Sequence, residues 1–241
     1  MKAHYLPVAI VVLLTSAFAH AQNWRGTTSG DWDTTGNWDT GTLPTNAATA
    51  TFTSGSYNTS VSLSTASTAR GVIFGTSALA YTIGGNYVLT LDKGGTLGGY
   101  VQSQTTATET FDLDVTFLAS TASSLVAGGV DFTSTSAGTI TFAAGHTLTM
   151  GTNTQLTIGG SSTAAGIVNI NGALVNTTAG AQLNNSGMTI LNFNPTSVTG
   201  SAFQLRSTGS GTVNVGTSSG SSLYSIGLGG NSGTAAGAVY V

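Results

Sequence analysis

Three tryptophans near the start of the chain are the side chains best suited to bind a ligand. They are Trp24, Trp32 and Trp38, the only indoles in the protein, and they alternate with Asp31, Asp33 and Asp39. Flat aromatic faces pack on sugar rings, and carboxylates accept hydrogen bonds from sugar hydroxyls, so the cluster predicts a carbohydrate platform. The alternative is a packed cap, in which Asp beside Gly forms turns and the indoles are buried. The packed cap is the preferred interpretation.

Two further carboxylates alternate with the apolar residues between Phe111 and Phe117. We expect Asp112 and Asp114 on one side of a single strand, roughly 7 Å apart at a rise of about 3.3 Å per residue. That separation permits inverting glycoside hydrolysis, and a carboxylate pair also suits Ca²⁺. No pocket-forming aromatic residue and no basic partner accompanies the pair, so a solvated strand face is the preferred interpretation and a calcium site comes second.

Other catalytic chemistry lacks the necessary residue types. The sequence has no cysteine, and His146 is the only histidine that follows Ala21. A Ser-His-Asp arrangement would require His146 to meet an acid from a distant turn of the fold. We therefore expect no catalytic residue and no cofactor, with calcium as the one possible ligand of this kind.

The segment from position 1 to position 21 has the pattern of a secretory leader. Lys2 precedes a short apolar run over residues 8–14, and small residues then lead to Ala19-His20-Ala21. A basic start, a short apolar core and an A-x-A site are typical of a signal peptide, here cleaved between Ala21 and Gln22. The apolar run is too short to span a bilayer, so we expect a mature chain without a membrane span. A buried N-terminal helix is the alternative.

Charge is the unusual feature of the composition. Only 5% of the 241 residues are Asp, Glu, Lys or Arg, and the net charge is -3. A typical globular protein has roughly 25%. Because no basic cluster exists to neutralise phosphates, nucleic acid is excluded as a partner.

The elements that would position these side chains are short strands. Apolar and polar residues alternate with a period of two, as in residues 139–142, 147–150 and 155–158, with Gly between the runs. Alternation and β-branched Thr, Val and Ile are typical of β-strands. The sequence therefore predicts an all-β protein: a sandwich, a barrel or a solenoid.

A parallel β-helix, or β-solenoid, is the preferred architecture, because the strands look interchangeable and their connections are small and polar. At about 20 residues a turn, residues 58–241 would make about nine turns. We expect Asn169 and Asn214 to point inward and to stack on neighbouring turns. An open solenoid end invites strand addition, so residues 22–57 are expected to form a Trp-rich cap.

The N-terminal segment is similar to the head of bacterial autotransporter-associated β-strand repeat proteins. The matching residues are Trp24, Ser29-Gly30, Trp32, Asn37-Trp38, Pro44 and Ala50-Thr51-Phe52, followed by a Thr/Gly-rich region. The resemblance covers the N-terminal third by motif and the rest by composition. It implies a secreted or cell-surface β-solenoid with a passive scaffold or adhesive role.

Three functions are therefore open at this stage. A non-enzymatic, adhesin-like surface scaffold is preferred, because the strands are uniform and catalytic groups are sparse. A carbohydrate-binding module using the tryptophans would have an extracellular or cell-surface polysaccharide as its partner. A polysaccharide lyase or hydrolase rests on the fold alone. The expected organisation is a leader over residues 1–21, a cap over 22–57 and a solenoid over 58–241.

Overall fold

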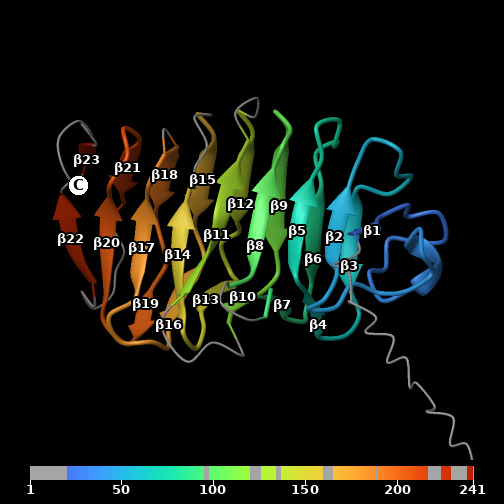
Figure 1. The fold of residues 1–241 in the computed structure, drawn as a ribbon, viewed down its shortest axis with the longest axis horizontal. Helices are drawn as coiled ribbons and strands as arrows, with labels where there is room; N and C mark the ends of the chain where they lie inside the picture. The colour runs from blue at the N-terminus through green and yellow to red at the C-terminus, as the bar shows by residue number, and fades with distance from the viewer. Residues whose placement is uncertain are drawn as a thin grey trace, which may run out of the picture.

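The strands of the protein stack into a parallel β-solenoid (Figure 1). The structure is a computed structural model and describes residues 21–94, 98–119, 126–133, 137–159, 165–187, 189–216, 224–228 and 238–240. All paired strands in it are parallel, and they form three sheets that run the length of the molecule. The predicted all-β parallel β-helix with a Trp-rich N-terminal segment is confirmed.

The first sheet has nine strands and faces the viewer in Figure 1. In spatial order it contains β1 (Ala21–Asn23), β2 (Thr49–Phe52), β5 (Gly71–Phe74), β8 (Tyr100–Ser103), β11 (Val126–Phe132), β14 (Thr154–Ile158), β17 (Gln182–Asn185), β20 (Phe203–Ser207) and β22 (Tyr224–Leu228).

Two further sheets complete each turn. The second contains β3 (Ser60–Leu63), β6 (Thr82–Gly85), β9 (Thr108–Asp112), β12 (Thr139–Phe142), β15 (Ile167–Ile170), β18 (Ile190–Phe193), β21 (Thr212–Val215) and β23 (Ala238–Tyr240). The third contains β4 (Ser67–Ala69), β7 (Leu89–Asp92), β10 (Val115–Leu118), β13 (Thr147–Met150), β16 (Ala173–Asn176) and β19 (Val198–Gly200).

The turns are longer and fewer than the sequence suggested. In the first sheet Val72 pairs with Val101, and further along the axis Asn185 pairs with Ser207. Each pair is separated along the chain by more than the expected repeat of about 20 residues. The separation of the first pair exceeds it by much more than that of the second. The solenoid therefore has about seven turns, and the expected nine are wrong. The difference comes from the corners, which take more residues than the strands alone require.

Alternating side chains fill the interior. Ile140 and Phe142 of β12 are buried, while Thr139 and Thr141, which alternate with them, are half-exposed, as a period of two predicts. Phenyl rings of successive turns stack along the axis. The Phe52 and Phe74 centroids lie 5.5 Å apart, and those of Phe111 and Phe142 lie 5.3 Å apart. The core is thus one continuous column of apolar side chains.

The N-terminal segment covers the exposed edge of each sheet at one end of the solenoid. In the first sheet β1 pairs with β2. Over the second sheet, Trp32 N donates to Ser62 O, and Ser62 N donates to Gly30 O, both at 2.8 Å. Beside the third sheet, Arg70 N donates to Thr45 O at 2.8 Å. Backbone groups that would otherwise remain open to strand addition are therefore paired.

The expected inward asparagines point outward. Asn169 and Asn214 are half-exposed, because they alternate with buried aliphatic residues such as Val168 and Val213. They do stack on neighbouring turns through Asn192, which donates to Asn169 Oδ1 at 2.7 Å and accepts from Asn214 Nδ2 at 2.7 Å. The ladder therefore lies on the outer surface of the second sheet.

The inward asparagines are Asn176 and Asn185, both fully buried. Asn176 Nδ2 donates to Ser201 O at 2.8 Å, and Asn185 Nδ2 donates to Thr189 O at 2.8 Å. Each satisfies carbonyl groups where the chain turns a corner, which water reaches poorly.

The proposed leader falls almost entirely on residues 1–20, outside the described residues. Ala21 and Gln22, the predicted cleavage residues, lie in β1, and Gln22 Oε1 accepts a hydrogen bond from the Thr40 hydroxyl. Among the described residues, no helix is long and apolar enough to cross a membrane.

Candidate functional site

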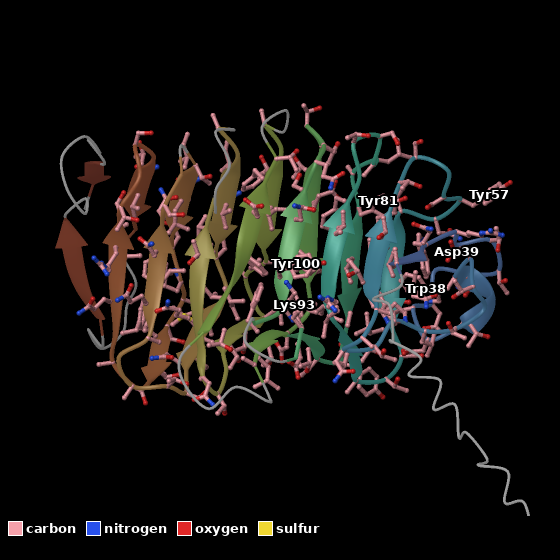
Figure 2. All side chains as sticks on the ribbon, in the orientation of Figure 1. Trp38, Asp39, Tyr57, Tyr81, Lys93 and Tyr100 are labelled. Atoms are coloured by element: carbon pink, nitrogen blue, oxygen red, sulfur yellow. The ribbon has the colours of Figure 1, made fainter. Side chains whose placement is uncertain are left out.

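The three tryptophans form a packed cluster, and Figure 2 shows one of them, Trp38, at the capped end. None of them exposes more than 2% of its surface. The Trp38 ring meets those of Trp24 and Trp32 edge-on, with centroids 5.1 Å and 4.9 Å away. Trp38 Nε1 donates to Trp32 O at 2.8 Å, and Trp24 Nε1 donates to Asn58 O at 2.9 Å. The indole faces are covered, as in the packed-cap interpretation, and they form no open platform for a sugar ring.

The aspartates among the tryptophans fix the backbone of the cap. Asp33 accepts hydrogen bonds from Ser64 N, Thr65 N and Ser67 Oγ at 2.7–2.8 Å. Burial opposes its ionisation, but these hydrogen bonds outweigh burial and hold its pKa below the usual value. Asp39 accepts from Asn23 N at 2.9 Å. These carboxylates are engaged within the protein.

Asp112 and Asp114 do not lie on one strand. Asp112 ends β9 in the second sheet, and Asp114 precedes β10 in the third. The buried side chain of Leu113 lies at the corner between them. The expected strand from Phe111 to Phe117 is therefore two strands, because the corner falls inside an alternating run.

His146 of the next turn lies between the two carboxylates. Its Nε2 is 3.4 Å from Asp112 Oδ1, and its Nδ1 is 3.7 Å from Asp114 Oδ1. The three side chains are 29%, 56% and 47% exposed for His146, Asp112 and Asp114. Asp114 Oδ1 also accepts from Thr147 N at 2.7 Å.

The cluster links two corners rather than enclosing a ligand. An imidazole occupies the space that a cation or a water nucleophile would need between the carboxylates. No three His, Cys, Asp or Glu side chains of the described residues are arranged to hold a metal ion. The calcium interpretation of Asp112 and Asp114 is not supported by this geometry.

A groove of about 340 Å³ opens on the outer face of the first sheet, where strands β8 and β11 lie side by side. It is lined by Lys93, Gly98, Tyr100, Gln102, Gly128, Gly129 and Asp131. Its volume is at the lower end of the range for small-molecule sites, about 300–1,000 Å³. Figure 2 shows Lys93 and Tyr100 next to one another on this face, away from the Trp cluster.

The register of the first sheet brings the groove residues together. Tyr100 pairs with Gly129 on one side and with Gly71 on the other, and Gln102 pairs with Asp131. Residues 100 and 102 point outward because Val101 and Ser103 beside them are buried. An aromatic ring, an amide and a carboxylate thus share one surface.

Burial raises the pKa of the Asp131 carboxyl, against hydrogen bonds from the Gln102 side chain and the Phe132 backbone. Asp131 Oδ1 is buried and accepts no hydrogen bond from the described residues. The pKa of Lys93 is lowered by burial and by the nearby charge of Arg70. The groove therefore has a partly desolvated cation and a partly desolvated carboxylate.

The sequence alone did not single out this groove. Tyr100 and Asp131 lie on successive turns, and the pairing of β8 with β11 is what makes them neighbours. The available signal was the alternation in Tyr100-Val101-Gln102-Ser103, which predicts that Tyr100 and Gln102 share a face. The contact of His146 with Asp112 and Asp114 was missed for the same reason, since these carboxylates lie one turn earlier.

One buried carboxyl lies outside all of these surfaces. Glu109 of β9 is fully buried, and its Oε2 accepts from Tyr81 N at 2.7 Å. Burial raises its pKa to about 7, partly offset by that hydrogen bond. Its position inside the core indicates a structural group.

No protein-family model, curated protein or solved structure matches the chain.

Proposed function

We propose that the protein is an exported scaffold of the cell surface or extracellular matrix, adhesin-like in form and acting without catalysis. The observation that carries the proposal is the continuous solenoid, whose three parallel sheets share one core and whose N-terminal edges are covered. Such a stack is a rigid rod that extends by repetition.

Surface chemistry supports the same role. Outward positions carry mainly Thr, Ser, Asn and Gln, and only 5% of all residues are charged. A protein with a nearly uncharged polar surface is stabilised by hydrogen-bond ladders rather than by ion pairs. The stability of such a protein depends little on the salt concentration of the external medium. The leader-like residues 1–21 support delivery outside the cytoplasm.

The proposal is tested by deleting the gene in its host and measuring surface attachment and envelope permeability. We expect a deficit that is restored by the full gene but not by one lacking codons 2–21, because only the former is exported. No deficit, or full restoration by the leaderless gene, would contradict the proposal.

The same experiment separates a scaffold from an enzyme. A gene carrying Asp112→Ala and Asp114→Ala together should restore the phenotype, since these exposed carboxylates contact only His146 and, from Asp114, the backbone of Thr147. Failure of this variant, with the protein folded and exported normally, would favour a polysaccharide hydrolase or lyase.

A further inference from the structure

The groove on the first sheet has an aromatic ring that the backbone holds in place. A Cβ at position 71 would lie 2.8 Å from the Cε1 and Cζ of Tyr100, so the ring occupies space that only a glycine leaves free. The Tyr100 hydroxyl lies 3.1 Å from Thr49 Oγ1. The Tyr100 side chain therefore extends from β8 over Gly71 of β5 to Thr49 of β2. These contacts fix the orientation of the ring in the absence of a ligand.

On the other side of the ring the sheet has a gap. Gly129 of β11 presents no side chain there and pairs directly with Tyr100, whereas the neighbouring Gly128 faces the core beside Phe117. On the next strand of the sheet, β14, the residue that pairs with Gly129 is Thr157. A molecule lying in the gap would contact backbone below it and the tyrosine ring beside it.

Polar groups of both kinds border the gap. The Lys93 ammonium lies over the Tyr100 ring, 5.7 Å from its centroid, which is close to the outer limit of a cation–π contact. Asp131 has a buried carboxylate oxygen without a hydrogen-bond partner among the described residues. Buried acceptors are normally satisfied, so the Asp131 carboxylate has room for a further donor, which a ligand supplies once the side chain turns toward the groove.

We propose that this groove binds a short segment of an uncharged polysaccharide. The C–H face of a pyranose ring packs on Tyr100, a sugar hydroxyl donates to the Asp131 carboxylate, and Lys93 donates to a sugar oxygen. The charges of Lys93 and Asp131 balance, which favours a neutral saccharide over an acidic one. This binding site goes beyond the scaffold role and does not depend on export.

The test is isothermal titration of the purified chain from Gln22 with soluble polysaccharides. The neutral probes are laminarin, cellohexaose, xylohexaose and galactomannan, and the acidic probe is polygalacturonate. We expect saturable binding of at least one neutral probe. Tyr100→Ala should weaken that binding by at least about tenfold, as removal of a central aromatic contact does. Asp131→Asn should weaken it by several-fold.

Two matched variants distinguish the ring from general effects. Tyr100→Phe keeps the ring and loses only the contact with Thr49, so it should bind within about threefold of the wild type. Tyr57→Ala removes a tyrosine that is 81% exposed at the capped end, and it should bind as the wild type does. Near-ultraviolet circular dichroism checks that each variant is folded.

Three results would overturn the proposal. They are absence of binding to every neutral probe at millimolar concentration, binding that Tyr100→Ala and Asp131→Asn leave unchanged in folded protein, and binding of polygalacturonate alone. Each is measured on purified protein, whereas the scaffold proposal is tested by complementation of the deletion. Failure of the groove and failure of the scaffold are therefore distinguishable.

Discussion

Glu109 makes the stability of the solenoid depend on pH. Its pKa is raised from 4.5 to about 7 in the folded protein, so the folded state holds a proton that the unfolded chain releases. The stabilising contribution is full below pH 4.5 and is lost as the pH rises to about 7. A shift of that size corresponds to about 3 kcal/mol.

We predict that Glu109→Gln removes this loss of stability at neutral and higher pH. The amide remains neutral at all pH values and keeps an oxygen that can accept from Tyr81 N. Urea unfolding at pH 8 should show the variant more stable than the wild type by about 2–3 kcal/mol, with near equality at pH 4. A variant whose stability falls between pH 4 and pH 8 as steeply as that of the wild type would refute the assignment.

Asp33→Asn provides the matched control. Its pKa is held below the usual value by hydrogen bonds, so the carboxylate is ionised throughout pH 5–8 in both folded and unfolded states. The substitution should cost about 1–3 kcal/mol by weakening bonds to Ser64, Thr65 and Ser67, equally at pH 5 and pH 8.

At the residue scale the sequence identified the aromatic cluster and favoured its burial without establishing it. Spacing placed Trp24, Trp32 and Trp38 together, and the packed cap was the interpretation it favoured. Burial of their faces could not be read from residue types, because it depends on Phe52 beneath them and on the loop that carries them. Tyr100 was missed because its neighbours come from other turns.

The strands themselves follow the alternation of the sequence closely. Runs such as residues 139–142 and 147–150 are strands because apolar residues at every second position face a common core. Corners were harder to place. Leu113 is apolar and buried at a corner, so the run from Phe111 to Phe117 looked continuous when it is not. Asn169, between Val168 and Ile170, could have been placed outward from the same alternation.

The asparagine ladder on the second sheet gives a prediction at this scale. Thr141, Asn169, Asn192 and Asn214 occupy successive turns and are joined by side-chain hydrogen bonds of 2.7–3.1 Å. Asn192→Ala removes two of these bonds, so it should lower the free energy of unfolding by about 1–2 kcal/mol, measured by urea titration.

Thr139→Ala is the control for the ladder. Thr139 is an outward residue of the same sheet that lies outside the ladder, and its replacement should change stability by less than about 0.5 kcal/mol. Equal effects of the two substitutions would mean that the ladder contributes nothing beyond ordinary strand positions.

At the scale of the whole molecule, the sequence established the architecture but not the number of turns. Interchangeable short strands with small polar connections favour a solenoid, and the structure is one. The count failed because corners of different length separate similar strands. The turn from Val72 to Val101 is longer than the turn from Asn185 to Ser207, and no single period describes both.

We expect the cap to keep the solenoid monomeric, because it pairs with strand edges that could otherwise join a second molecule. Trp38 packs against both other indoles and against Phe52, and this cluster holds the loop that pairs Gly30 and Trp32 with Ser62 of β3. Removal of the central ring leaves a cavity in the cluster and loosens the loop. Strand edges of β2 and β3 then become available to a second chain.

We therefore predict that Trp38→Ala is destabilised by about 3–5 kcal/mol and associates in a concentration-dependent way. Light scattering coupled to size exclusion, over a range of protein concentrations, should show a higher apparent mass for the variant than for wild type. Tyr57→Ala, also at this end but largely exposed, should behave as wild type. If Trp38→Ala is destabilised yet keeps the wild-type mass at every concentration, the cluster stabilises the end of the solenoid without being needed to block edge-to-edge pairing.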